Sequence, residues 1–311
     1  MARGKRLFSN GELAFMILPV AWVASWWVYP QSLIYVMHAV GRTGRCSAAD
    51  AVRSPRNVKE LESLSIHLQE QSRAERVDNS GLVRWTTPEG VFWAPPDTAA
   101  PFLVAEQEVA TYGEGQRGVQ KGDIVVDCGA NIGTFVHRAL KLGAARVVAV
   151  EPSGRNVECL RRNFASEIAE GRVLVYPKGV WHKEETLTMW VYGNSALDSF
   201  VMTERGEEKA KPRAVPFPVT TIDKLVSELN LGRVDFLKMD VEGAERNALE
   251  GAQATLARFH PRAAIATENL VDDQVVVPQL MRRAWAGYRE ECGRCLPASR
   301  FEIRPEVIFF F

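Results

Sequence analysis

Cysteine is scarce in this chain of 311 residues, and its five copies are scattered and odd in number. A small secreted protein that disulfides hold together has a denser and even set of cysteines, so the sequence argues against that class. We therefore expect free thiols and a reducing compartment. The cysteines occupy positions 46, 128, 159, 292 and 295.

A second pair of cysteines to match the CxxC motif at Cys292 and Cys295 is also missing. Zinc needs four ligands, and no histidine is spaced as a partner for the motif. A redox CxxC normally opens a helix after a strand, whereas this one enters a loop. We expect both residues, and Cys128 as well, to be ordinary packing residues.

Net charge is absent too, because 38 basic residues balance 38 acidic ones. No basic stripe with interleaved aromatic residues appears in the C-terminal part, so we expect no nucleic-acid partner. Glycine (23) and proline (16) are too few for a collagen-like or disordered chain with 46% apolar residues. The length accommodates a single α/β domain of about 200 residues with additional segments.

Charged residues do not occur at all in residues 13–40, which are mostly apolar and contain several tryptophans and tyrosines. A transmembrane helix needs about 20 such residues, and these aromatic residues are typical of membrane interfaces. We predict a basic tail over 1–12, a single-pass anchor over 13–40 and a juxtamembrane connector over 41–80. A cleaved signal peptide and an interfacial or buried helix are the alternatives.

Basic residues flank the apolar run on both sides, with the larger number after it. This excess favours a cytoplasmic catalytic domain and contact with an anionic membrane surface. In the connector, Ser54-Pro55 predicts the start of a helix that carries one apolar stripe. The stripe can pack on the catalytic domain or contact the membrane, and the sequence leaves both open. Its members are Val58, Leu61, Leu64 and Leu68.

Residues 81–311 predict an α/β domain that opens with a β-hairpin over 82–94. Apolar strands then alternate with amphipathic helices, which is typical of a doubly wound parallel sheet covered on both faces. Two late strands, 288–292 and 305–311, are separated by a loop and should pair antiparallel. The earlier strands are expected at 123–128, 146–151, 172–176, 234–239 and 263–267, and the helices at 132–142, 153–165, 243–258 and 274–285.

The first of these strands runs into a glycine-containing turn that begins at Asp127. Gly129 and Gly133 are four residues apart with Asn131 between them, so the GxGxxG motif of an NAD-linked oxidoreductase is absent. Glu151 ends the next strand, where a carboxylate can accept hydrogen bonds from both hydroxyls of a ribose. Two carboxylates and no phosphate cradle predict S-adenosylmethionine, with Asp127 facing its ammonium group. Alternatively, both acids only cap the adjacent helices.

Asp240 ends the strand that we expect beside the Asp127 strand, and strand alternation places Lys238 on the same face. We predict that Asp240 removes the proton of an acceptor hydroxyl or orients the acceptor. Lys238 is expected to be buried, paired with Asp240 or Glu242, and part of the catalytic set. Glu242 is also a candidate for binding the acceptor. The alternative is an ion pair that merely holds this loop to the following helix.

Glu268 and Asn269 end the next strand and are candidates for catalysis and acceptor binding. With Asp240 they form a set of three oxygen ligands for a hard cation, but such sets often arise by coincidence, and we favour a metal-free site. Asn194 and Ser195 lie in a long connection that can form a substrate lid, although an ordinary turn is equally consistent with them.

These residues together resemble the FkbM family of class I methyltransferases over about 105–311. The resemblance rests on the turn 127–133, Glu151-Pro152, the segment 220–223 (TTID) and, most specifically, the segment 235–245 (DFLKMDVEGAE). It implies a seven-stranded sheet whose last strand is antiparallel, and S-adenosylmethionine as the methyl donor. It implies donor-binding roles for Asp127, Gly129, Asn131, Gly133, Glu151 and Pro152.

The resemblance also implies an oxygen acceptor on a sugar or natural product. One position departs from the family, which often has Glu-x-His where this chain has Asn269 as the nearest polar residue. We therefore predict a membrane-anchored methyltransferase for a sugar, glycan or natural-product hydroxyl, with a lipid-linked acceptor among the candidates. The alternative is a membrane-tethered ligand-binding module that keeps the fold without turnover.

Overall fold

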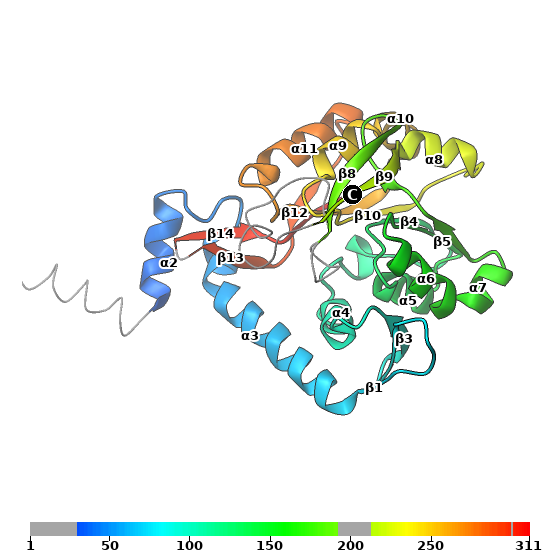
Figure 1. Cartoon of the computed structure of the whole chain (residues 1–311). Coiled ribbons are helices and arrows are strands. Elements are labelled where there is room, and N and C mark those ends of the chain that lie inside the picture. Colours follow the sequence, from blue (N-terminus) through cyan, green and yellow to red (C-terminus); the bar gives the residue numbers. More distant parts are fainter. Residues whose placement is uncertain (1–29, 192–212, 300) are drawn as a thin grey trace, which may run out of the picture.

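A seven-stranded mixed sheet forms the centre of the protein, in the order β12-β15-β11-β10-β4-β5-β6. The computed structural model describes residues 30–191, 213–299 and 301–311 (Figure 1). Five strands are parallel, and β15 runs antiparallel to both β11 and β12. The bounds are β4 Ile124–Cys128, β5 Arg146–Val150, β6 Val173–Tyr176, β10 Phe236–Met239, β11 Arg262–Ala266, β12 Glu290–Cys292 and β15 Val307–Phe310.

Helices cover both faces of this sheet, and as a result nearly every residue of its central strands is buried. One face packs on α8 to α11 around Leu237 and Ile265, and the other packs on α5 and α6 around Phe236 and Val147. The doubly wound sheet of the sequence analysis is therefore confirmed. The helices are α5 Thr134–Lys141, α6 Gly154–Asn163, α7 Ala165–Ala169, α8 Ile222–Glu228, α9 Glu245–Glu250, α10 Gln253–Phe259 and α11 Asp273–Ala284.

The prediction of one continuous helix over 243–258 is wrong, because the segment forms two helices, α9 and α10. Gly251 lies at the break, where an added Cβ would be 2.1 Å from the carbonyl oxygen of Trp181. Asp223 lies in the first turn of α8 and accepts hydrogen bonds from the amides of Ala254 and Thr255 at the start of α10. Close packing against the neighbouring loop thus decides where the helix ends.

Smaller sheets surround the central one. The predicted hairpin over 82–94 is present as β2 (Val83–Thr87) and β3 (Gly90–Ala94), and a third strand, β1 (Arg73–Glu75), pairs with β2. A short helix, α4 (Ala100–Glu108), and the 3₁₀ turn η1 (Gly115–Arg117) lead to β4. Beyond β6, β7 (Gly179–Val180), β8 (Glu185–Val191) and β9 (Arg213–Thr220) form a sheet of their own. The sequence analysis did not predict α4, β8 or β9.

The connector contains a helix that is longer than predicted. Helix α3 spans Ala48–Gln71 and begins after Ser47, whose hydroxyl accepts a hydrogen bond from the amide of Asp50, so Pro55 lies inside the helix rather than at its start. Its apolar stripe packs inward: Leu61 and Leu68 are buried in one cluster with Phe92 and Val104. Of the two alternatives for this stripe, packing on the catalytic domain is the one observed.

The predicted membrane anchor lies largely outside the described residues, which begin at Pro30. Its last part forms α2 (Pro30–Ala39), where Ile34 and Met37 are buried against Cys295 and Ile303. Across the three described ranges, no helix is both long and apolar enough to span a bilayer.

The expectation of free thiols is wrong for two of the five cysteines. Cys46 and Cys295 form a disulfide that joins positions 249 residues apart in the sequence. Cys295 begins β13 (Cys295–Ser299), which pairs with β14 (Glu302–Pro305) inside the loop predicted between the late strands. Spacing alone gives no indication of such a pairing, because only the fold brings the segments together. Cys128, Cys159 and Cys292 remain free, and Cys128 is fully buried as predicted.

Candidate active site

A cavity of about 400 Å³ lies beyond the carboxyl ends of β4, β5, β10 and β11. This is the edge at which open α/β sheets bind ligands. Gly129 and Asn131 follow β4, Glu151 and Pro152 follow β5, and Asp240 follows β10, and all five line the cavity. The topology thus brings together residues that lie up to 111 positions apart.

Glu151 is held rigidly at one end of the cavity. Its two carboxylate oxygens accept hydrogen bonds of 2.9 Å from the backbone amides of Asn131 and Ser153. Only 6% of its surface is exposed. Each carboxylate oxygen can accept more than one hydrogen bond, so Glu151 keeps acceptor capacity for a ligand in the cavity.

The turn after β4 requires its glycines for two different reasons. Gly129 has φ +80°, and an added Cβ would be 1.8 Å from the carbonyl oxygen of Asp240, so the backbones of the two loops approach closely there. Gly133 has φ +92°, and its Cβ would collide with the ring of Phe164. Gly129 lines the cavity, whereas Gly133 allows α5 to pack on α6 and does not line it.

Asp127 lies beneath the cavity rather than on its wall. Its side chain is completely buried, and its Oδ1 is 3.2 Å from the ammonium of Lys238, the residue directly opposite it in the β4–β10 register. The predicted contact of Asp127 with a ligand therefore needs correction, as does the pairing of Lys238 with Asp240 or Glu242. A buried carboxylate needs a buried cation nearby, and Lys238 supplies it.

Lys238 links this ion pair to the cavity. Its ammonium donates a 2.8 Å hydrogen bond to the carbonyl of Gly129 and lies 4.9 Å from the ring centre of Tyr112. Burial alone would lower the pKa of Lys238, but the carboxylates of Asp127 and Asp240 outweigh it and the pKa is raised. The ammonium is therefore charged at neutral pH and stabilises negative charge at the cavity floor.

Asp240 has a partner that the sequence analysis missed. The hydroxyl of Tyr112 donates a 2.6 Å hydrogen bond to Oδ2 of Asp240. Burial and the nearby carboxylates of Asp240 and Glu106 raise the pKa of Tyr112, so the phenol stays protonated and remains a donor. The ring packs edge-on against Phe135, which fixes the direction of the hydroxyl.

Further carboxylates line the same end of the cavity. Glu106 comes from α4, Glu268 follows β11, and Glu306 lies between β14 and β15. Burial, together with Glu306, Asp240 and Glu268, raises the pKa of Glu106 well above its usual value. Glu268 was predicted here. Glu106 and Glu306 were not, although an isolated acid before the apolar run 307–311 was a signal for Glu306.

The loop after β10 is held from below by a buried carboxyl. Oε1 of Glu245 accepts hydrogen bonds from the amide of Val241 (2.9 Å) and from Nδ2 of Asn269 (3.1 Å). Asn269 is thus engaged with Glu245 and does not line the cavity, contrary to its predicted acceptor-binding position. Glu242 does line the cavity, with φ +53°.

Two predicted acceptor-binding residues, Asn194 and Ser195, lie outside the described residues. Among the residues that the structure does describe, no group of three or more histidine, cysteine, aspartate or glutamate side chains is arranged to hold a metal ion.

Residues 127–284 match the family model described as "Methyltransferase FkbM domain". The match covers half of the chain and contains the β4 turn, Glu151 and the segment 235–245. The chain belongs to the FkbM methyltransferase family. The sheet order and the antiparallel β15 agree with the class I methyltransferase fold that this membership implies, so that prediction is confirmed.

Two curated fungal proteins are similar to this FkbM-family chain. "Methyltransferase sdnD" of Sordaria araneosa is 29% identical over 153 residues, which cover 41% of this chain and 59% of the relative. "Methyltransferase 1" of Beauveria bassiana is 29% identical over 143 residues, covering 41% and 57%. The chain thus spans less than two thirds of the length of these relatives.

A solved structure, methyltransferase FkbM from Methylobacillus flagellatus KT, aligns with a TM-score of 0.47 at 18% identity. The alignment covers 87% of this chain and 64% of that one.

Proposed function

We propose that this protein is an S-adenosylmethionine-dependent methyltransferase that methylates a hydroxyl of a sugar, glycan or natural product. The observation that carries the proposal is one continuous cavity. A rigidly held Glu151 lies at one end and the hydrogen-bonded pair of Tyr112 and Asp240 lies at the other. Membership of the FkbM family supports the same activity.

The donor end is formed by Glu151, Pro152 and the turn at Gly129 and Asn131. Glu151 accepts hydrogen bonds from the ribose hydroxyls, because the backbone amides of Asn131 and Ser153 already fix its orientation. Gly129 and Asn131 of the turn after β4 also line this end and would hold the donor beside Glu151. S-adenosylmethionine, when bound, supplies a methyl group on a positively charged sulfur.

The acceptor end is formed by Asp240, Tyr112, Glu106 and Glu268. Asp240 accepts the proton of the acceptor hydroxyl, and Tyr112 holds the carboxylate in place by donating to its other oxygen. Lys238, anchored by Asp127, keeps positive charge at the cavity floor near this carboxylate. The protein thus positions two reactants and removes one proton in a largely buried site.

Several carboxyl groups at one end of a cavity suit an acceptor with many hydroxyl groups. An ionised carboxylate accepts hydrogen bonds, and a protonated carboxyl, which the raised pKa of Glu106 favours, can also donate one. Phe102 and Leu103 of α4 add apolar surface beside them. This combination of apolar surface and acceptor oxygens suits the face and edge of a sugar ring, which supports a glycan or glycosylated acceptor.

The experiment that tests this function is transfer of radiolabelled methyl groups from S-adenosylmethionine to the lipid and glycan fractions of a lysate. Wild-type protein should label one fraction. Asp240→Asn should retain donor binding and lose about a hundredfold or more of the transfer, in the range expected for general-base removal. If the wild-type protein binds the donor but transfers no methyl group to any fraction, the alternative of a ligand-binding module is favoured.

Membrane association through residues 13–29, the part of the predicted anchor that precedes α2, belongs to the proposal as well. The absence of charge in that run supports it. Binding to liposomes, measured for the full chain and for a chain that starts at Pro30, tests this proposal. Loss of liposome binding on deletion supports an anchor, and equal binding of the two chains contradicts it.

A further inference from the structure

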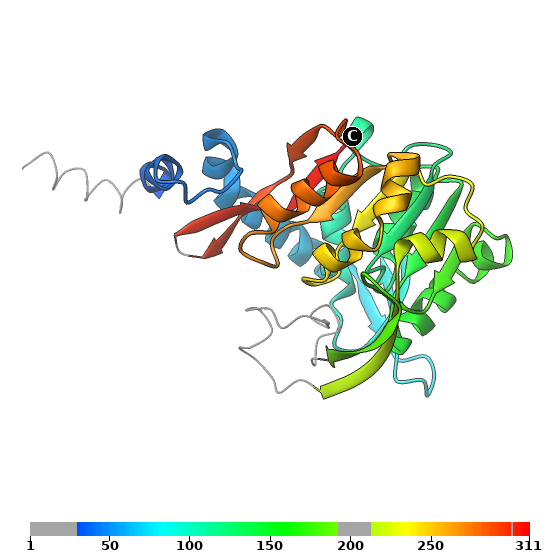
Figure 2. The same ribbon diagram turned by 90° about the horizontal axis from the view of Figure 1, so that it is seen from above.

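Helix α3 and the C-terminal hairpin together form one wall of the cavity. Figures 1 and 2 show the β13–β14 hairpin projecting from the sheet toward α2 and α3. Leu61 of α3, Leu296 of β13 and Glu306 just after β14 all line the cavity. The position of this wall therefore depends on how the two segments, far apart in sequence, are held together.

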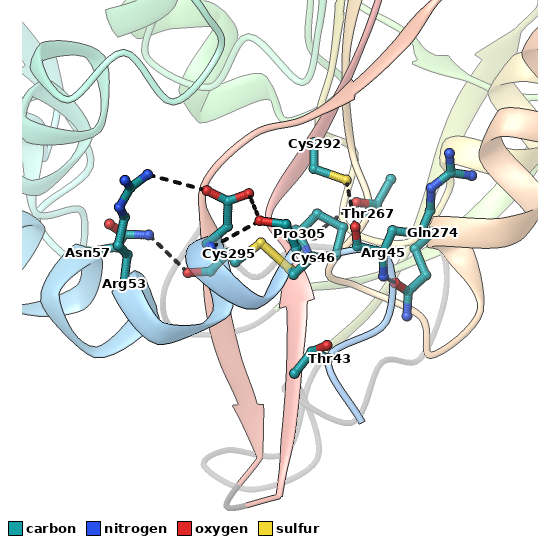
Figure 3. The surroundings of a disulfide bond; sticks show 12 residues. Thr43, Arg45, Cys46, Arg53, Asn57, Thr267, Gln274, Cys292, Cys295 and Pro305 are labelled. Atoms are coloured by element: carbon teal, nitrogen blue, oxygen red, sulfur yellow. Dashed lines mark hydrogen bonds and ion pairs between the residues drawn. A yellow bond between two sulfur atoms is a disulfide. The ribbon is translucent and has the colours of Figure 1, made fainter. Parts of the chain in front are cut away.

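The contacts between the two segments surround the disulfide (Figure 3). Cys46 and Cys295 are surrounded by a small apolar cluster that includes Ile34, Met37 and Ile303. Hydrogen bonds add to it, among them one that Nη2 of Arg294, directly before β13, donates to the carbonyl of Asn57 in α3. The amide of Ile303 donates to the carbonyl of Arg42 at 3.0 Å, and Nδ2 of Asn57 donates to the carbonyl of Cys295 at 3.1 Å.

This cluster is much smaller than the two clusters on the faces of the sheet, and it lies away from them. Its apolar burial is correspondingly limited, so the covalent bond contributes a large part of the attachment. Cutting the bond leaves the apolar cluster and these hydrogen bonds to hold the hairpin against α2 and α3, and it removes no residue from the central sheet.

The other end of the cavity does not depend on this attachment. Glu151, Asn131 and Ser153 are held to one another by backbone hydrogen bonds at the ends of β4 and β5. Both strands belong to the centre of the sheet, whereas the hairpin follows its edge strand β12.

We propose that the Cys46–Cys295 disulfide positions the acceptor-side wall of the cavity, and that its reduction loosens this wall while the donor end stays intact. The names donor and acceptor rest on the proposed function. A dithiol reductant supplies two electrons and two protons, the S–S bond breaks, two thiols form, and the dithiol becomes a cyclic disulfide. Such bonds persist in oxidising compartments, so the inference places the catalytic domain there and opposes the cytoplasmic location expected from the charge pattern.

Cys292 provides a matched control. It is a free thiol close to the disulfide, and its Sγ is 3.5 Å from the carbonyl oxygen of Arg45 (Figure 3). Burial raises the pKa of this thiol, which makes it a poor nucleophile toward the neighbouring bond. Replacing Cys292 should therefore leave the wall unchanged.

The test begins with a count of thiols in the purified full chain. Alkylation under denaturing conditions should modify three cysteines without a reductant and all five after dithiothreitol. Hydrogen exchange of the native protein, followed by mass spectrometry, then compares the two states. Peptides of β13 and β14 should exchange at least tenfold faster after reduction or in Cys46→Ser, whereas the peptide 124–133 should not change. Cys292→Ser should behave as the wild type.

Calorimetry with S-adenosylhomocysteine reports on the other end of the cavity, and its Kd should change less than threefold on reduction. Five free thiols before reduction, or unchanged exchange of β13 and β14 after it, would overturn the inference. So would faster exchange of 124–133 together with lost affinity, because the bond would then support the whole domain. If S-adenosylhomocysteine binds neither state, the proposed function fails, while the exchange data still decide the inference.

Discussion

The buried carboxyl of Glu245 gives a prediction about stability and pH. It is completely buried and its Oε1 accepts two hydrogen bonds, whereas its Oε2 has no hydrogen-bond partner among the described residues. Burial, reinforced by Asp240, raises its pKa from 4.5 to about 8. A proton on Oε2 also provides a donor next to Asn269, whose Oδ1 is likewise unsatisfied.

The pH dependence of the free energy of unfolding follows from this shift. Between pH 4.5 and about 8 the folded protein holds a proton on Glu245 that the unfolded chain has lost, so stability decreases as pH rises. The slope reaches roughly 1.4 kcal/mol per pH unit, because one proton is involved. The contribution is complete below pH 4.5 and is lost as the pH approaches 8.

Glu245→Gln removes this titration but keeps the oxygen that accepts from Val241 and Asn269. Urea denaturation from pH 5 to 9 should show that the wild type loses stability relative to the variant between pH 5 and 8 by on the order of 4 kcal/mol in total. Glu250→Gln, an exposed residue on the same helix, serves as the control and should follow the wild type. A constant offset between wild type and Glu245→Gln at every pH would refute the reasoning.

Three further predictions concern the cavity. Gly129→Ala should abolish S-adenosylhomocysteine binding in calorimetry, because its Cβ would overlap the Asp240 carbonyl; unchanged affinity would contradict the close approach. Tyr112→Phe should lower kcat for methyl transfer about tenfold with little change in donor Kd, since it removes the hydrogen bond to Asp240; an unchanged kcat would exclude that role. Lys238→Met should destabilise the fold by about 3 kcal/mol in denaturation, because Asp127 loses its partner, and Lys238→Met with Asp127→Asn should recover part of the loss; no recovery would contradict the pairing.

Much of the fold was predictable because its signals are local. The central strands are continuous apolar runs, and the turn 127–133 and the segment 235–245 are specific enough to indicate the family. The division of the helix at Gly251 was not predictable, because it depends on the carbonyl of Trp181 in another loop. Helix α4 was not predicted because its apolar residues do not repeat with a clear helical period.

Most of the residues predicted for the site lie around one cavity, but their individual contacts differ from those predicted. Strand alternation correctly placed Lys238 and Asp240 on one face, but parallel register places Asp127 opposite Lys238, and this decides the ion pair. Tyr112 reaches Asp240 from outside the motif, so no spacing rule connects them. The Cys46–Cys295 bond was missed for the same reason, since connectivity over 249 residues is a property of the fold.

The most direct test of the account is calorimetric titration of S-adenosylmethionine into the wild type and Glu151→Gln. We expect one binding site in the wild type and at least tenfold weaker binding in the variant, with an unchanged circular dichroism spectrum. No binding to the wild type, or equal affinity for both proteins, would contradict the assignment of Glu151 and its cavity to the methyl donor.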